Sequence, residues 1–187
     1  MKEVELKRVD LDYKNFVKRT ALETDFTTLI KEPCILTENG EIKAVYDIVD
    51  IDTESLFKDL KSIQYTKGKR TRGLFSQSRI FGFKPRMPIR ADDFCGSTSL
   101  ANENPQVHAK VANLAVEIER YYQKHNPEGY KKHHDLATGK VKEQWRLNKD
   151  SVFTSGIINK NNPLKYHFDA GNFNSVYSMM IVFKSGV

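Results

Sequence analysis

Long apolar segments are missing from this chain of 187 residues. No run approaches the roughly 20 apolar residues that a membrane-spanning helix needs, and the first 20 residues lack the apolar centre of a signal peptide. Cysteine is scarce as well: Cys34 and Cys95 are the only two, and they form no CxxC pair. This pattern is typical of reduced thiols and not of a disulfide scaffold. These absences predict a cytoplasmic protein without a membrane partner.

Acidic residues are absent between Tyr65 and Ala91, although the whole chain carries 24 of them and a net charge of +6. The same stretch contains several phenylalanines and eight cations. Those cations are Lys67, Lys69, Arg70, Arg72, Arg79, Lys84, Arg86 and Arg90. Lysine and arginine bind phosphates, and aromatic rings can stack on bases. The stretch therefore favours DNA as a partner, with a solvated basic loop as the alternative.

The order of expected elements indicates an α+β protein. Asn39-Gly40 separates two arms of alternating apolar residues within 34–46, the strongest short signal for a β-hairpin. A helix is expected after Thr53, and a strand is expected over 79–83. A long helix is expected over 105–125, because Pro105 suits a first helical position and apolar residues recur on one face.

The last third of the chain changes character. Residues 127–150 are polar and are expected to form a connector, and the adjacent His133 and His134 diverge too much in direction to favour a shared metal. Residues 152–158 and 176–183 are expected to be strands. The second is apolar on both of its faces, which predicts a strand covered on both sides.

The tripeptide His167-Phe168-Asp169 lies in the loop between these two expected strands. A His and an Asp two residues apart on an extended chain point to the same side. A site of two His and one carboxylate holds iron(II) while leaving positions open for a cosubstrate and O₂. A surface His and Asp with no metal is the alternative interpretation. No His follows Asp169, so the sequence predicts that this chain carries part of such a site, as a truncated or split product or as one piece of a larger enzyme.

The order of several segments resembles the TET/JBP family of 2-oxoglutarate and iron(II) dependent DNA base dioxygenases, in particular its phage-like members. The resemblance covers about residues 65–187, and HxDxxN with the strand after it is its most specific part. It rests on the segments RIFGFKPR (79–86), RADDFC (90–95), ENPQVH (103–108), YHFDAGN (166–172) and SMMIVFKSG (178–186).

The resemblance implies a double-stranded β-helix fold of the jelly-roll or cupin-like type with supporting helices, incomplete in this chain. Residues 65–187 would form the N-terminal part of that domain, preceded by a hairpin and helix region at 1–64. It implies oxidation of the 5-methyl group of 5-methylcytosine or thymine in DNA, and the host cytoplasm as the location if a phage encodes the chain.

The family also implies roles for single residues. His167 and Asp169 match its first two iron ligands, Asn172 matches a residue that contacts the target base, and Asn159 matches, more loosely, a position that assists 2-oxoglutarate binding. Backbone contacts to DNA are expected from Lys67, Lys69, Arg70, Arg72, Arg79, Arg86 and Arg90. The family's distal His ligand and its 2-oxoglutarate-binding Arg have no counterpart here, which leaves room for a second chain that completes the site.

Two other functions stay open on the sequence. The chain could be a basic DNA-binding or partner-binding module without catalysis, or a 2-oxoglutarate oxygenase of another substrate. Stoichiometric iron favours an enzyme, whereas salt-sensitive DNA binding without iron favours a module. The target base, the extent of oxidation and the oligomeric state do not follow from the sequence.

Overall fold

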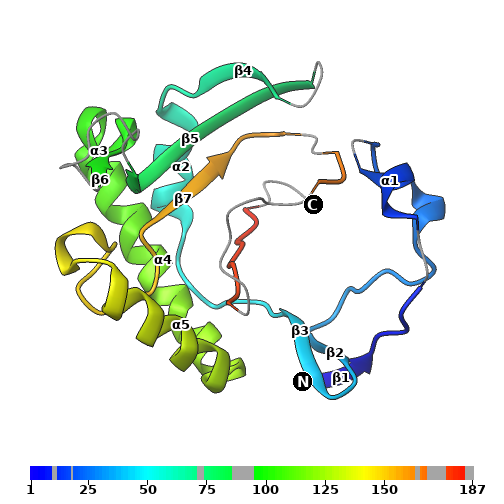
Figure 1. Cartoon of the computed structure of the whole chain (residues 1–187). Coiled ribbons are helices and arrows are strands. Elements are labelled where there is room, and N and C mark those ends of the chain that lie inside the picture. Colours follow the sequence, from blue (N-terminus) through cyan, green and yellow to red (C-terminus); the bar gives the residue numbers. More distant parts are fainter. Residues whose placement is uncertain are drawn as a thin grey trace. The chain divides into compact units, whose positions relative to one another are not determined.

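The computed structural model describes residues 1–9, 12–17, 19–70, 74–85, 95–162, 165–167 and 176–183, with the backbone alone at 69, 70, 74, 75 and 85. The described residues form an α+β structure of five α-helices and seven strands (Figure 1). The chain divides into two compact units. Unit 1 comprises 1–51, 70–74 and 163–172, and unit 2 comprises 52–69, 75–162 and 173–187. The boundary expected at 64/65 stays a prediction.

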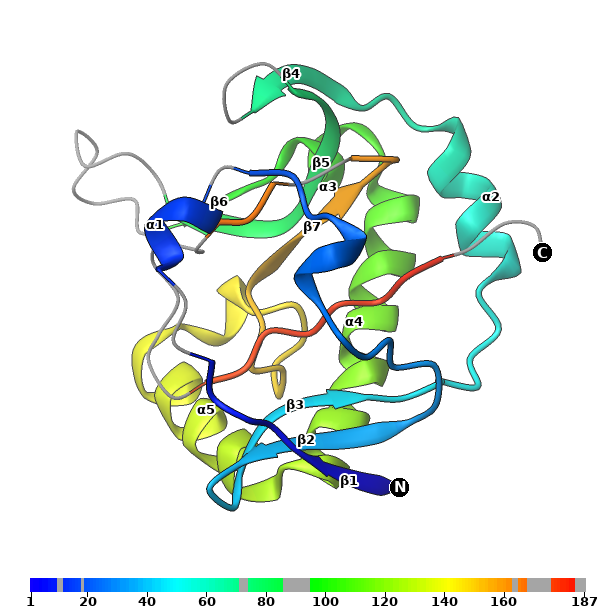
Figure 2. The ribbon, with the colours of Figure 1, turned by 90° about the vertical axis from the view of Figure 1, so that its right-hand side faces the viewer.

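The sheet of unit 1 contains the predicted hairpin. Strands β2 (Cys34–Glu38) and β3 (Glu41–Tyr46) pair antiparallel, and β1 (Lys2–Glu5) joins β2 in parallel (Figure 2). Asn39 and Gly40 have φ angles of 54° and 77°. A two-residue turn with both φ values positive matches the twist of paired strands, which is why this dipeptide makes the hairpin.

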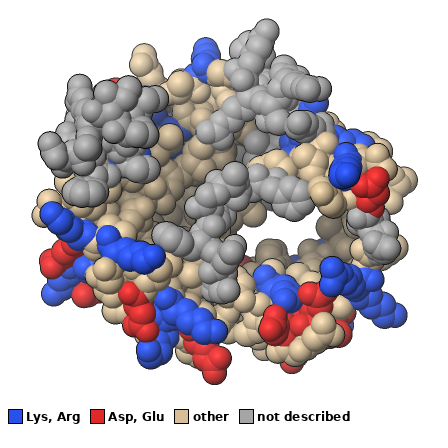
Figure 3. Space-filling model, in the orientation of Figure 1, with Lys and Arg blue, Asp and Glu red and all other residues tan. Residues whose placement is uncertain are grey.

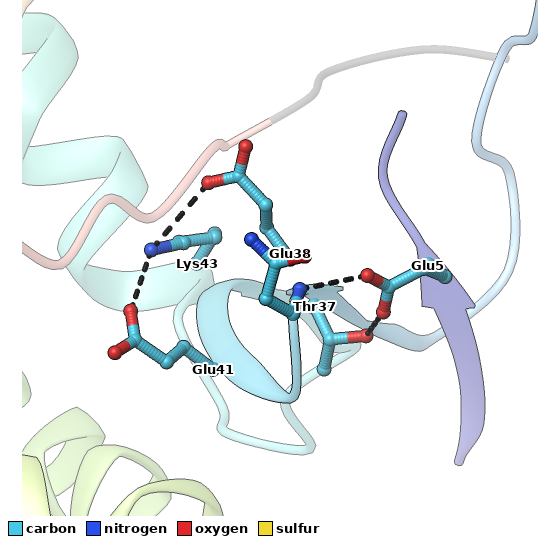
Figure 4. A network of polar contacts seen from close by, with 6 residues as sticks. Glu5, Thr37, Glu38, Glu41 and Lys43 are labelled. Carbon is cyan, nitrogen blue, oxygen red and sulfur yellow. Dashed lines mark hydrogen bonds and ion pairs between the residues drawn. The ribbon is translucent and has the colours of Figure 1, made fainter. Parts of the chain in front are cut away.

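Polar contacts fasten β1 to this hairpin (Figure 4). The Glu5 carboxylate accepts hydrogen bonds from the Thr37 hydroxyl at 2.7 Å and from the Asn39 backbone N–H at 2.8 Å. These bonds lower the pKa of Glu5. Lys43 pairs with Glu41 at 2.7 Å and with Glu38 at 3.6 Å. Short helix α1 (Tyr13–Phe16), which the Asp12 carboxylate caps through the Lys14 N–H, also belongs to unit 1.

Helix α4 (Pro105–His125) forms the centre of unit 2, as its sequence predicts. Helices α2 (Glu54–Ser62), α3 (Ser99–Glu103) and α5 (Pro127–Lys140) all contact it. Apolar side chains from these helices form the buried core. They are Leu56, Leu60, Leu100, Val111, Ala112, Leu114, Ala115, Ile118, Tyr122 and Ala137. The helix expected after Thr53 is confirmed as α2.

Helix α5 corrects the expectation of a connector over 127–150. The Asn126 side chain accepts a hydrogen bond from the Gly129 N–H at 2.9 Å, and Pro127 occupies the first turn. Both features start a helix. Its buried residues, Gly129, His133 and Ala137, recur every four positions. The sequence concealed this stripe because none of the three is a large apolar residue.

The sheet of unit 2 is built on the long strand β5 (Leu74–Pro85), which contains the predicted strand 79–83. It neighbours β4 (Thr66–Arg70) and pairs antiparallel with β6 (Cys95–Ser97) and β7 (Ser155–Asn159). Strand β7 begins three residues later than the expected strand over 152–158.

A glycine bends β5 where its partner changes from β7 to β6. Gly82 has φ 82°, and a Cβ atom there would overlap the carbonyl oxygen of Thr154. Its N–H donates a hydrogen bond of 3.0 Å to Nε2 of His108, a residue in the first turn of α4. His108 therefore fastens the sheet to the central helix, and burial lowers its pKa. This hydrogen bond gives His108 a structural role.

The expectation that residues 176–183 form a strand covered on both faces is wrong. These residues have no strand pairing with the described part of the chain. Met180 and Val182 are 88% and 76% exposed, so the segment is not covered on both faces. Its other side is half-buried: the Tyr177 ring packs against Tyr122, and Phe183 stacks on Phe57. Apolar composition predicted burial, but one side of the segment lies open to solvent.

Candidate metal centre and nucleic-acid interface

His167 lies in unit 1, in the described segment 165–167, and its imidazole is exposed. The Nδ1 atom lies 2.6 Å from the backbone carbonyl oxygen of Lys165. A carbonyl only accepts hydrogen bonds, so the contact assigns the proton to Nδ1. The lone pair is then on Nε2, the atom that most often binds metal when Nδ1 donates to a carbonyl. This tautomer is one of the two that a metal-binding imidazole can adopt.

Asp169 and Asn172, the expected second ligand and base contact, lie outside the described residues. Within the described part, no three His, Cys, Asp or Glu side chains cluster closely enough to hold a metal ion. The two histidines of α5 have different surroundings. His133 is buried against Tyr122 and Phe153, and His134 lies near Asp135. Burial lowers the pKa of His133.

The segment that carries His167 is attached to the N-terminal region. The Tyr166 N–H donates to the Arg19 carbonyl oxygen at 2.9 Å, and its hydroxyl lies 3.3 Å from Asp25. The Tyr166 ring also meets Phe16 edge-on, with ring centroids 5.9 Å apart. Sequence reasoning missed these three partners, because residues 141 or more positions away leave no local pattern around His167.

Asn159, the expected cosubstrate contact, ends strand β7 in unit 2 and pairs with Ser78 of β5. Its side-chain oxygen accepts a hydrogen bond of 2.9 Å from the Asn162 amide. Asn162 in turn accepts the Gln77 N–H at 2.6 Å. The amide network joins the end of β7 to the neighbouring strand, so the position has an evident structural role.

The expected DNA-contacting cations differ in how far the structure describes them. Lys67 of β4 is exposed, as is Lys84 of β5, a further cation of the acid-free stretch. Lys69 and Arg70 lie on β4, but their side chains are not described. Arg72, Arg86 and Arg90 lie outside the described residues.

Arg79 differs from the other cations. It is 6% exposed, and its guanidinium forms an ion pair with Glu103 at the end of α3. A buried, paired guanidinium cannot readily contact a phosphate, so Arg79 does not belong to the candidate interface. On the face drawn in Figure 3, Lys and Arg side chains alternate with Asp and Glu over α5, where Lys131 pairs with Asp135 at 2.8 Å. The acid-free stretch is thus a better candidate than α5 for contacting nucleic acid.

No family model, curated protein or solved structure matches the chain. The resemblance noted in the sequence therefore rests on its own residues. Cys34 and Cys95 are free thiols. None of the helices in the described part of the chain combines the length and apolar character that a membrane crossing requires.

Proposed function

We propose that the chain is part of a 2-oxoglutarate and iron(II) dependent dioxygenase of the TET/JBP type that oxidises the 5-methyl group of a DNA base. The observation that carries the proposal is the His167-Phe168-Asp169 element together with the Nδ1 contact of His167 to the Lys165 carbonyl. The double-stranded β-helix fold forms part of this proposal. The target base in this proposal is either 5-methylcytosine or thymine.

In this proposal the residues of the chain bind and orient, and iron with 2-oxoglutarate supplies the oxidation of the methyl C–H bond by O₂. His167 and Asp169 would provide two of the ligands that hold the iron. A base inside a duplex is out of reach, so the target nucleotide must be flipped out. Cations of the acid-free stretch hold the DNA backbone during this step, and Asn172 hydrogen-bonds to the base edge.

Iron binding tests the metal part of the proposal. We expect anaerobic iron(II) titration to show weak binding to the wild-type chain, since two ligands do not complete a three-ligand site. Binding should disappear in His167→Ala and in Asp169→Ala. His134→Ala is the matched control, because it removes another partly exposed imidazole outside the candidate element. Equal iron binding by the wild type and both ligand variants would refute the assignment.

DNA binding tests the substrate part. Fluorescence anisotropy over a range of salt concentrations should show an affinity that falls as salt rises. Replacing Lys67, Lys69 and Arg70 of β4 together by Ala should reduce the slope by about one per lost phosphate contact. A control with equal charge loss replaces Lys131, Lys132 and Lys140, exposed residues of α5. Equal effects of the two triple variants would show that only net charge matters.

The exposed lysine of β4 supports a second candidate, a DNA-binding module without catalysis. The two titrations separate the candidates. Iron and salt-dependent DNA binding together support the dioxygenase, and DNA binding without iron supports the module. Iron binding without DNA binding supports an oxygenase of another substrate.

A further inference from the structure

The segment before the candidate ligand His167 is held by residues from the first 25 positions of the chain. Tyr166 is fixed at two points, through its backbone N–H to the Arg19 carbonyl at 2.9 Å and through its hydroxyl to Asp25 at 3.3 Å. Its ring meets the Phe16 ring at an interplanar angle of 77°. All of these residues belong to unit 1.

The partners of Tyr166 are themselves bound to one another. The Arg19 guanidinium donates to Asp25 at 2.6 Å and lies 4.6 Å from the centroid of the Phe16 ring. Asp25 also accepts the Leu22 N–H at 2.8 Å, and its side chain is only 9% exposed. Arginine–carboxylate pairs of this kind are among the stronger and more directional contacts in proteins. The hydrogen bond from Arg19 lowers the pKa of Asp25, so this carboxylate is ionised at neutral pH.

This network reaches the metal candidate through the backbone. Tyr166 directly precedes His167, and the imidazole contacts the carbonyl of Lys165, the residue directly before Tyr166. Fixing Tyr166 therefore fixes both the backbone that bears the imidazole and the carbonyl that sets its tautomer. Such outer contacts decide how a ligand faces its metal.

We infer that Phe16, Arg19 and Asp25 are positioning residues for His167 as a metal ligand, acting through Tyr166. The inference rests on the proposed function, because it assumes that His167 binds the metal. It gives the N-terminal region a part in the site, whereas the resemblance begins only near residue 65. These residues touch neither metal nor substrate, so they set affinity and ligand geometry and take no part in chemistry.

Cobalt(II) titration of the full chain tests the inference, because the visible spectrum of bound cobalt reports ligand geometry as well as affinity. Asp25→Ala should weaken cobalt binding by about 10-fold or more, the usual size of an outer-contact effect, and should alter the spectrum. Tyr166→Phe removes the hydroxyl contact alone and should weaken binding about 3-fold. Arg19→Lys keeps the cation and should lie between the wild type and Asp25→Ala.

Glu38→Ala is the matched control, since Glu38 is another carboxylate of unit 1 and pairs with Lys43, not with Tyr166. Its cobalt affinity and spectrum should equal those of the wild type. Circular dichroism checks that each variant folds. If Asp25→Ala does not fold, the cobalt affinity of Tyr166→Phe tests the positioning role.

The outcomes separate the two proposals. Cobalt bound through His167 with unchanged affinity and spectrum in Asp25→Ala and Tyr166→Phe overturns the positioning role and leaves the proposed function intact. An equal loss in Glu38→Ala also overturns it, because the effect would then be general destabilisation. No binding by the wild type overturns both.

Discussion

The two compact units of this protein are stabilised in different ways. In unit 2, the described core is a set of apolar side chains on α2, α3, α4 and α5. In unit 1, Cys34 is the one buried hydrophobic residue among those described, and Val9, Leu29 and Ile48 are 66%, 63% and 67% exposed. Hydrogen bonds and ion pairs at half-exposed positions hold unit 1 together instead. The comparison teaches that the candidate metal ligand lies in the unit with the smaller apolar core.

This contrast has an energetic consequence. Burial of a leucine-sized side chain contributes about 1.5–3 kcal/mol, whereas exposed ion pairs contribute little and are screened by salt. Unit 1 should therefore open more readily than unit 2, and a metal bound to its folded form would stabilise it.

A matched pair of leucine truncations tests the contrast most strongly. Leu114→Ala removes a buried side chain of α4 and should lower the free energy of unfolding of unit 2 by about 3 kcal/mol. Leu36→Ala removes a half-buried side chain of β2 and should cost about 1 kcal/mol in unit 1. Native-state hydrogen exchange reports both units separately. Equal costs would contradict the difference in packing.

A buried carboxylate in the unit 2 core provides the second test. Glu119 accepts hydrogen bonds of 2.7 Å from both the Ser151 hydroxyl and the Val152 N–H, which fixes the turn before β7. Glu119→Ala leaves two buried donors unsatisfied and should cost about 2–4 kcal/mol in urea unfolding. Glu119→Gln keeps an acceptor oxygen and should cost far less. A full loss in Glu119→Gln would show that the charge, not the acceptor, is needed.

The same residue predicts a pH dependence with a definite sign. Burial raises the pKa of Glu119 above its ordinary value of 4.5. The folded state therefore holds the proton more tightly, and this contribution to stability is complete below pH 4.5 and is lost as pH rises through the folded pKa. Unfolding of Glu119→Gln, which does not titrate there, gives the baseline. A stability difference that does not change with pH would contradict the assignment.

Glu5 in unit 1 should show the opposite sign with a smaller effect. Hydrogen bonds from Thr37 and Asn39 lower its pKa, so its stabilisation is present above pH 4.5 and is lost as pH falls through the folded pKa. Glu5→Gln should remove this acid sensitivity from the exchange of β1 and β2 amides. Glu3→Gln, an exposed neighbour on the same strand, is the control. An identical pH profile in wild type and Glu5→Gln would contradict the role.

Local signals predicted some elements well and others badly. Asn39-Gly40 fixed the hairpin because few other dipeptides accept two positive φ angles, and Pro105 with a wide apolar face identified α4. Helix α5 escaped because its stripe of Gly129, His133 and Ala137 carries little apolar signal. The reverse error occurred at 176–183, where apolar residues predicted burial that Met180 and Val182 do not have.

The candidate site was predictable only at its centre. The spacing of His167 and Asp169 suggested ligands, and the contact of His167 with Lys165 fits a ligand tautomer. The attachment to Phe16, Arg19 and Asp25 could not be foreseen, since contacts between distant segments depend on the fold and not on neighbouring residues. Arg79 is an exception among the cations. Its charge suggested a contact with DNA, but its side chain is buried and forms an ion pair with Glu103.

Hydrogen exchange with and without anaerobic iron(II) tests whether His167 binds the metal, because it locates the metal on the chain without requiring turnover. We expect iron to slow exchange in two peptides of unit 1, one containing Tyr166 and His167 and one spanning Phe16 to Asp25. Exchange in α4 and α5 should stay unchanged. Slower exchange around His133 and His134 of α5, or no change in unit 1, would contradict this expectation.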